Sequence, residues 1–266
     1  MYLTIIVPAY REGDRLWSTL ECLQRYLAAQ QYASVVLVVE NGEGGESDSR
    51  LRRGGGSLVR WIREPRRGKG AAVRRGMLEA AGRFRFLCDA DLAMPVEQIA
   101  RFLPPLVSGR DLAIGSREIP GARRHHQPML RRLMGRTFNQ FVRWSVLPDF
   151  ADTQCGFKCF AAAAAEDLFR AQSIDGMSFD VEVLYIARQR NYRIQEVPID
   201  WYHRDGSRVR IVRDSLQMVS DVMRIRHNAR AGRYASSGST GLASEAAPRT
   251  SRLAPLGSSA HSRREP

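Results

Sequence analysis

The chain has 266 residues, of which 44% are hydrophobic and 26% charged, a composition typical of a soluble globular protein with a full-sized core. The sequence contains no apolar run long enough for a transmembrane helix, and its first residues lack the basic stretch of a signal peptide. The four cysteines have neither the density of a disulfide scaffold nor the spacing of a zinc site. We therefore expect a protein of the reducing cytoplasm.

The net charge of +13 points to a negatively charged partner. Of the 41 basic residues, only Lys69 and Lys158 are lysines, and all the others are arginines. Nucleic acid, an anionic membrane surface and a phosphorylated ligand all fit such a balance. Charge alone does not choose among the three.

The first half of the chain alternates short β-branched runs with helical periodicity. Strands are predicted over residues 3–8, 34–40, 58–63, 84–89 and 112–115. Helices are predicted over residues 14–30, 70–81 and 96–103. Strands that alternate with helices form βαβ units, so we expect an α/β fold in which helices flank a mostly parallel sheet.

The second half is less regular and ends in a segment with few bulky apolar residues. Residues 127–147 are predicted to form a long amphipathic helix with arginines interspersed along its apolar stripe. Further strands are predicted over residues 156–160 and 194–201, and further helices up to residue 170 and over 179–189 and 213–228. We expect one domain over residues 1–230 and a disordered tail rich in Gly, Ser, Pro and Arg over residues 231–266.

Polar clusters follow several of the predicted strands. They comprise residues 8–12, 40–42, 89–91 and 115–118. In parallel α/β sheets ligands bind outside the carboxyl ends of the strands. The sequence therefore predicts a site of nucleotide size at this edge.

Of these clusters, Asp89 and Asp91 point most specifically to one kind of chemistry. Two carboxylates one residue apart can both turn toward one hard cation, which prefers oxygen ligands and bridges to phosphates. The alternative is that Asp91 caps the helix that starts near Pro95 and that Asp89 is merely exposed. The position of the pair directly after an apolar run favours the cation site.

Two loops and a helix start also carry candidate residues. Lys69 lies between two glycines in the basic segment 66–70, which precedes a helix and is either a phosphate-binding turn or a tight structural turn. It is not a P-loop, because no Ser or Thr follows the lysine. The segment 152–158 gathers polar groups around one glycine, as an active-site loop does. Asp180 opens a helix, where a carboxylate is favoured by the helix dipole in any case.

Taken in order, these segments resemble family 2 glycosyltransferases of the GT-A fold, in particular the dolichyl-phosphate β-glucosyltransferase branch. The matching stretches read TIIVPAYRE (4–12), VVENG (38–42), RGKGAAVRRGM (67–77), DADLAMP (89–95), GSRE (115–118), DTQCGFKCF (152–160), FDVEVL (179–184) and EVPIDW (196–201). The resemblance extends over roughly residues 3–228. It implies a Rossmann-like GT-A domain with a mixed, mostly parallel sheet.

The resemblance also implies the reaction and the residues that serve it. A hexose passes with inversion from a nucleotide-sugar to a polyprenyl phosphate. Uracil and ribose would contact Pro8, Tyr10, Glu12 and Glu40. Asp89 and Asp91 would hold Mg²⁺ or Mn²⁺ on the diphosphate, with Lys69 near the donor. The lipid phosphate would meet Arg117, Arg131 and Arg132. The sugar and acceptor site would be completed by Asp152, Gln154 and Lys158.

Several alternatives remain open within and beyond this family. The donor is expected to be UDP-glucose, with GDP-mannose as the alternative. A soluble hydroxyl acceptor would need a general base, for which Asp180 is the candidate, whereas a phosphate acceptor is already ionised. A non-catalytic nucleic-acid-binding module is disfavoured, because the arginines are dispersed and acidic pairs lie where phosphates would bind.

Two departures from the family pattern concern the nucleotide pocket and the membrane. The second strand ends in Glu40-Asn41-Gly42-Glu43, where the family commonly has Asp-Asp-Gly-Ser. The membrane anchors that relatives carry are absent from this sequence, so we expect peripheral contact at the cytoplasmic face of an anionic membrane. The basic helix 127–147 either lies in the bilayer interface or packs on the core with a solvated basic face.

Overall fold

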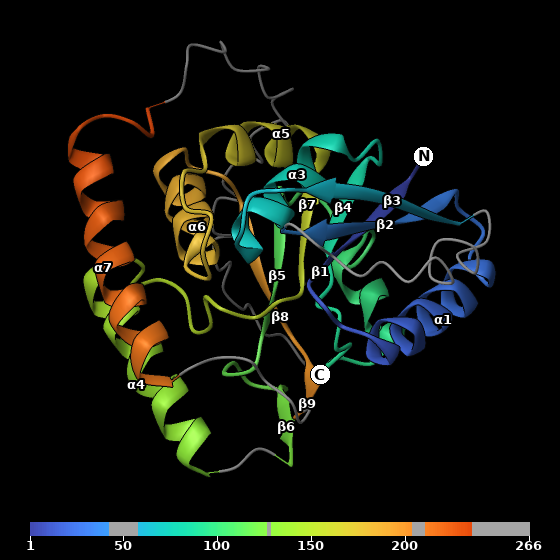
Figure 1. Cartoon of the computed structure of the whole chain (residues 1–266), viewed down its shortest axis with the longest axis horizontal. Helices are drawn as coiled ribbons and strands as arrows, with labels where there is room; N and C mark the ends of the chain where they lie inside the picture. The colour runs from blue at the N-terminus through green and yellow to red at the C-terminus, as the bar shows by residue number, and fades with distance from the viewer. Residues whose placement is uncertain (43–57, 127–128, 204–210, 236–266) are drawn as a thin grey trace, which may run out of the picture. The chain divides into compact units, whose positions relative to one another are not determined.

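The computed structural model describes residues 1–42, 58–126, 129–203 and 211–235 (Figure 1). Within α4 and α7 it does not describe the side chains of residues 129–135, 138 and 211–216. The strands are β1 Leu3–Ala9, β2 Ser34–Asn41, β3 Val59–Glu64, β4 Phe84–Leu87, β5 Leu112–Ser116, β6 Arg123–His125, β7 Lys158–Ala161, β8 Ile194–Pro198 and β9 Asp200–Tyr202. The helices are α1 Asp14–Ala28, α3 Lys69–Glu79, the 3₁₀ helix η1 Val96–Phe102, α4 Met129–Ser145, α5 Ala162–Ala171, α6 Phe179–Gln189 and α7 Ile211–Arg230.

A seven-stranded sheet forms the centre of the domain, in the order β3-β2-β1-β4-β7-β5-β8. All neighbouring strands run parallel except β7, which pairs antiparallel with both β4 and β5. The inner strands β1 and β2 are apolar almost throughout, as expected of parallel strands covered on both faces. The α/β fold with a mostly parallel sheet is confirmed.

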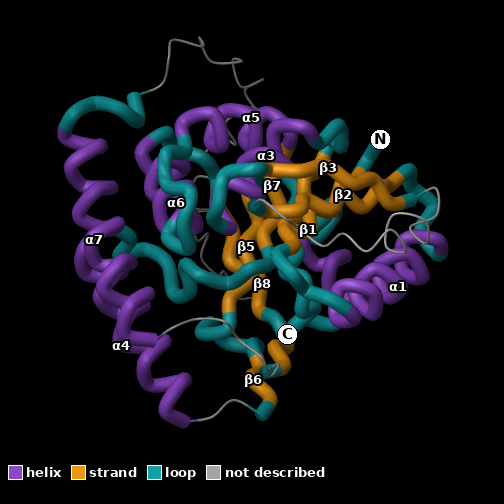
Figure 2. Tube along the Cα trace, viewed as in Figure 1, coloured by secondary structure: helices purple, strands orange, loops and turns teal. Residues whose placement is uncertain are grey.

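Helices cover both faces of this sheet (Figure 2). On one face, α1 contributes leucines at spacings of three and four residues to a core that includes Ile5, Val7 and Val38. On the other face, α3, α5 and α6 pack on a core that includes Ile6 and Val39. Alternate residues of β1 and β2 thus face opposite layers, as the strand period requires.

Three predicted elements differ in the structure. The segment 96–103 forms a short 3₁₀ helix, because Pro95 and Pro104 bracket it and leave no room for a longer α-helix. The strand predicted over residues 194–201 is two strands, since the chain crosses at Ile199 from the large sheet to the small sheet of β6 and β9. The fourth strand ends at Leu87, so Asp89 lies in the following turn.

The last described segment runs past the end of α7. Tyr234 is buried there, and its hydroxyl donates to Glu182 Oε1 at 2.7 Å. Residues 236–266 lie outside the described residues, so the tail stays a prediction. Among the described residues, no helix combines the length and the apolar character that a membrane span requires.

Candidate active site

The carboxyl edge of the parallel strands collects the predicted polar clusters. Because β2, β1 and β4 are neighbours and parallel, the chain leaves all three at the same edge, at Asn41, Ala9 and Leu87. Strand β7 runs the opposite way, so its first residue, Lys158, lies opposite Leu87 at that edge. The loop 152–157, which enters β7, therefore faces the turn that follows β4.

Asp89 and Asp91 lie in this turn, which a side chain from α1 holds in place. Thr19 of α1 is buried and donates its hydroxyl to the Ala90 carbonyl at 2.8 Å. The Lys69 Nζ lies 2.6 Å from Asp89 Oδ1, and the two side chains are 20% and 29% exposed. Burial and the charge of Asp89 raise the pKa of the Asp91 carboxyl. A cation between the two carboxylates would relieve this repulsion.

The backbone of Gly156 lies against the Asp89 carboxylate. A Cβ atom at Gly156 would lie 1.9 Å from Asp89 Oδ2 and 2.4 Å from Asp89 Cγ. No side chain is therefore compatible with this carboxylate position. The glycine of the 152–158 loop, recognised in the sequence only as part of a polar cluster, is a direct neighbour of a candidate metal ligand.

The loop before α3 is held by Asn41 from the end of β2. The Asn41 Nδ2 donates to the Arg66 carbonyl at 2.7 Å, and Asn41 Oδ1 accepts from the Gly68 N–H at 2.9 Å. Gly68 has a φ of 126°, and a Cβ there would meet the Asp175 carbonyl at 2.0 Å. The loop thus delivers Lys69 to the first position of α3, beside Asp89.

Lys158 and Asp180 form a second lysine–aspartate pair in the interior. The Lys158 Nζ donates to Asp180 Oδ1 at 2.7 Å and also to the Cys155 carbonyl, and the two side chains are 1% and 5% exposed. Burial raises the pKa of Asp180, while the charges of Lys158 and Lys69 oppose that rise. Asp180 lies in the first turn of α6, as predicted.

Arg117 and Asp152 form a bidentate pair at the ends of β5 and of the 152–157 loop. Arg117 Nε and Nη2 donate to the two carboxylate oxygens at 2.7 and 3.0 Å, and the Arg117 N–H donates at 3.0 Å. Burial alone would raise the pKa of Asp152, but the Arg117 charge and hydrogen bonds lower it to about 2. The Asp152 and Ala151 N–H groups donate in turn to Glu196.

The residues predicted for the nucleotide pocket lie along the ends of β1 and β2. Tyr10 is exposed, and its ring would be 3.5 Å from a Cβ at Gly42. Glu12 is paired with Arg15, whose side chain is on α1. Pro8 is half-buried in β1, and Glu40 is buried at the end of β2.

The remaining predicted residues are placed less fully. Gln154 is half-buried, and its N–H donates to Asp152 Oδ1 at 3.2 Å. Arg131 and Arg132 belong to α4, but their side chains lie outside the described residues. Within the described ranges, no three or more His, Cys, Asp or Glu side chains are grouped to hold a metal ion.

Sequence reasoning missed three positioning residues. Thr19 reads as an ordinary helix position, and Glu196 as part of a strand. Asn41 was noted as part of the polar cluster 40–42 and as a departure from a family pattern, without a role of its own. The signal that identifies each of them is a hydrogen bond to a distant loop, which becomes visible only in the folded chain.

The sheet order and the two helical layers define the GT-A class of fold. Glucosyl-3-phosphoglycerate synthase from Mycobacterium tuberculosis, solved with Mn²⁺, UDP-glucose and phosphoglyceric acid, is a structural neighbour with a TM-score of 0.62. The match spans 84% of this chain and 79% of that one at 15% sequence identity. At this identity the similarity establishes the shared fold.

The sequence comparisons identify the family. The model of glycosyl transferase family 2 matches residues 4–164. A dolichyl-phosphate β-glucosyltransferase from Dictyostelium discoideum is 31% identical over 85% of this chain and 74% of the relative. The enzyme of that name from Drosophila melanogaster is 34% identical over 84% of this chain and 74% of the relative. The chain therefore belongs to glycosyl transferase family 2.

Proposed function

We propose that the chain transfers glucose from UDP-glucose to a polyprenyl phosphate of the dolichyl type, with inversion, at the cytoplasmic face of a membrane. The relatives from Dictyostelium discoideum and Drosophila melanogaster are named dolichyl-phosphate β-glucosyltransferases, and each matches most of this chain. The observation that carries the proposal is the edge at which Asp89, Asp91 and Lys69 lie together beside the 152–157 loop.

On the donor side, Asp89 and Asp91 would hold Mg²⁺ or Mn²⁺ against the diphosphate. The fit rests on the donor set: two carboxylates offer the oxygen ligands that such cations prefer, and the pKa of one of them, Asp91, is raised by burial and by the charge of Asp89. When bound, the ion supplies positive charge to the leaving diphosphate. Lys69 would contribute a second positive charge there, and Tyr10, Pro8, Glu12 and Glu40 would contact the nucleoside.

On the acceptor side, the phosphate oxygen attacks the anomeric carbon as the bond to UDP breaks, which inverts the configuration. The phosphate is ionised at neutral pH, so this step needs no general base. Arg117 would meet the phosphate with Nη1, because Asp152 takes up Nε and Nη2. Arg131 and Arg132 would add charge from α4, and Gln154 would complete the site.

The state of Asp180 supports a phosphate acceptor over a hydroxyl acceptor. A general base must reach the proton that it removes. Asp180 is 4% exposed and bonded to the Lys158 ammonium at 2.7 Å, which leaves it poorly placed for that task. Lys158 and Asp180 would instead shape the wall of the sugar and acceptor site.

The test is a transfer assay with the purified chain, Mn²⁺ and a short polyprenyl phosphate. UDP-glucose and GDP-mannose are each offered, and the lipid product is identified by mass. We expect polyprenyl-phosphate-glucose from UDP-glucose alone, and its loss on addition of EDTA. Product from GDP-mannose would replace the proposed donor. Hydrolysis of the donor without lipid product, or transfer only to a soluble hydroxyl compound, would overturn the proposed acceptor.

A further inference from the structure

One face of α7 carries exposed apolar side chains in line with arginines. Val219 and Met223 are 39% and 51% exposed, although most large apolar residues of the domain are buried. Arg226 and Arg230 follow at spacings of three and four residues, which places all four on one face of the helix. Other positions of α7 pack into the core, through Val222 and Ile225.

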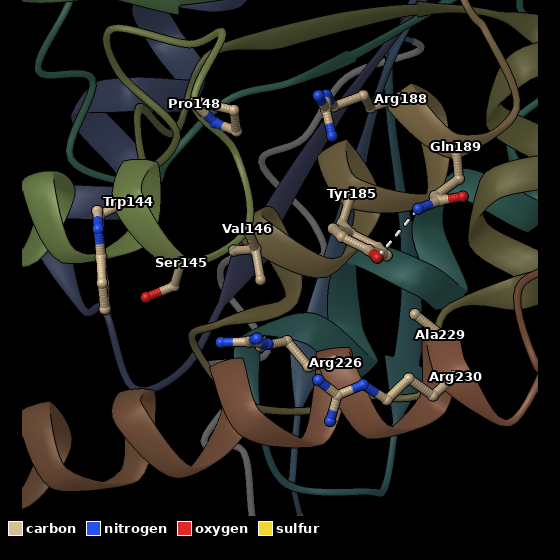
Figure 3. Close-up of a pocket in the computed structure, with 10 residues that line it drawn as sticks. All are labelled: Trp144, Ser145, Val146, Pro148, Tyr185, Arg188, Gln189, Arg226, Ala229 and Arg230. Carbon is tan, nitrogen blue, oxygen red and sulfur yellow. Dashed lines mark hydrogen bonds between the residues drawn. The ribbon is translucent and has the colours of Figure 1, made fainter.

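The end of α4 extends this face with an aromatic residue. Trp144 is 82% exposed, more than any other large apolar side chain in the described residues. It borders a hollow of about 500 Å³ between α4, α6 and α7 (Figure 3). We call Trp144, Val219, Met223, Arg226 and Arg230 the α4–α7 surface.

The hollow is positively charged. Arg188, Arg226 and Arg230 line it, and none of the described residues that line it carries a carboxylate. Arg188 is paired with Asp149 at 2.5 Å, whereas Arg226 and Arg230 have no hydrogen bond or ion pair to any described residue. Like charges one helical turn apart repel each other. An anion between these guanidinium groups would remove the repulsion.

We propose that the α4–α7 surface docks on the headgroup layer of an anionic phospholipid bilayer. Tryptophan prefers the depth at which headgroups meet acyl chains, and Val219 and Met223 would enter the same layer. Arg226 and Arg230 would bind lipid phosphates, which guanidinium groups hold through two hydrogen bonds. The inference rests on the lipid acceptor of the proposed function and assigns the surface that would bring the chain to it.

The mixture of side chains favours a bilayer over other anionic partners. A soluble phosphate or a nucleic acid would use the arginines but would leave Val219, Met223 and Trp144 in water. The surface is also linked to the candidate site through α6. Asp180 lies at the start of this helix and Arg188 lies eight residues later, about 12 Å along the axis at 1.5 Å per residue.

The experiment measures binding of the full chain to vesicles by sedimentation, without any donor. Vesicles of pure phosphatidylcholine are compared with vesicles that contain 30% phosphatidylglycerol, a proportion of about one charged lipid in three. We expect binding to the anionic vesicles only. The double variant Arg226→Ser/Arg230→Ser should lower the partition coefficient about thirtyfold, because each arginine near an anionic surface contributes about fivefold.

A matched control removes the same charge elsewhere. Arg25 on α1 and Arg110 are exposed arginines outside the α4–α7 surface, and Arg25→Ser/Arg110→Ser should change the partition coefficient by less than about threefold, since charges beyond a Debye length are screened. Trp144→Ser should weaken binding and abolish the blue shift of tryptophan fluorescence on vesicle addition. Equal losses in the two double variants, or displacement of the chain by inorganic phosphate alone, would overturn the proposal.

Failure of the inference can be told apart from failure of the proposed function. In detergent with a short polyprenyl phosphate, Arg226→Ser/Arg230→Ser should turn over like the parent chain, and it should lose activity only when the acceptor is embedded in vesicles. Vesicle binding without transfer by the parent chain would contradict the proposed function alone. Transfer in vesicles that is insensitive to this double variant would contradict the inference alone.

Discussion

The only two lysines of the chain form similar ion pairs in two different regions. Lys69 and Asp89 meet at the sheet edge at 2.6 Å, with side chains 20% and 29% exposed. Lys158 and Asp180 meet at 2.7 Å in the interior, with side chains 1% and 5% exposed. Water and ligands reach the first pair, so its partners can exchange. The second pair is sealed, so each charge depends on the other. We therefore expect the exposed pair to contact ligands and the buried pair to stabilise the fold around the site.

Removal of one lysine from each region gives the largest expected difference. Lys158→Met leaves the Asp180 carboxylate buried without a partner, and we expect the free energy of unfolding to fall by about 3–5 kcal/mol. Lys69→Met leaves Asp89 within reach of water, and the expected loss is below about 1 kcal/mol. Urea unfolding of the two variants measures both values.

The double variant Lys158→Met/Asp180→Leu provides the control for this experiment. Because it removes both charges and keeps apolar volume, it should recover most of the stability that Lys158→Met loses. Equal destabilisation by Lys158→Met and Lys69→Met would mean that burial does not distinguish the two pairs.

At the sheet edge, we expect substitution of Asp91 to lower the rate of glucose transfer and to leave the stability of the fold unchanged. Asp91→Asn should reduce kcat about 10²–10³-fold, the usual cost of removing one electrostatic contact to developing charge. Its free energy of unfolding should not decrease, because burial and Asp89 already disfavour the ionised Asp91, as its raised pKa indicates. Asp14→Asn on α1 is the matched surface control and should keep full turnover. Normal turnover by a folded Asp91→Asn protein would remove Asp91 from the metal site.

The Arg117–Asp152 pair should make the free energy of unfolding depend on pH in acid. The pKa of Asp152 is lowered from 3.8 to about 2, so the folded state holds this carboxylate ionised at pH values where the unfolded chain binds a proton. The pair therefore contributes about 2 kcal/mol above pH 4, and this contribution is lost as the pH falls through about 2. In Arg117→Ala, burial would raise the Asp152 pKa and reverse the slope. Unfolding free energies between pH 5 and 2.5 test the sign.

Much of the fold was predictable because its signals are local. Apolar runs such as those of β1 and β2, separated by helical periodicity, are typical of a parallel α/β sheet. The Asp89–Asp91 pair was recognisable because it follows such a run. The direction of β7 was not predictable, since four residues, KCFA, read equally well either way. Only the pairing of Lys158 with Leu87 and Ile114 places the 152–157 loop at the carboxyl edge.

The role of Asn41 shows why a departure from a family pattern can be structural. Its amide donates to the Arg66 carbonyl and accepts from the Gly68 N–H. An ionised aspartate has no donor for the first of these bonds. The substitution was visible in the sequence. Its reason was not, because the loop 66–68, which needs both a donor and an acceptor from residue 41, lies about 25 residues further along the chain.

Gly156 belongs to the loop before β7 and lies against Asp89 at the sheet edge, so it connects the two regions. Of the substitutions considered, Gly156→Ala is expected to have the smallest effect, and that effect is on metal affinity. In Gly156→Ala the new Cβ must displace the Asp89 carboxylate, because the present distance to Oδ2 would be 1.9 Å. We expect the affinity for Mn²⁺ to fall about tenfold, the lower end of what displaced supports of metal ligands cause. Titration of Mn²⁺ followed by electron paramagnetic resonance measures this without turnover.

Gly176→Ala is the matched control for this substitution, because a Cβ there finds only Asp221 Oδ2, at 3.9 Å. It should leave Mn²⁺ affinity unchanged. An unchanged affinity in Gly156→Ala as well would mean that the Asp89 carboxylate can rotate away and still bind. In that case the 152–157 loop would not position the Asp89 carboxylate, and the two regions would act independently. A fall confined to Gly156→Ala would instead show that the loop before β7 sets the geometry of the metal ligand.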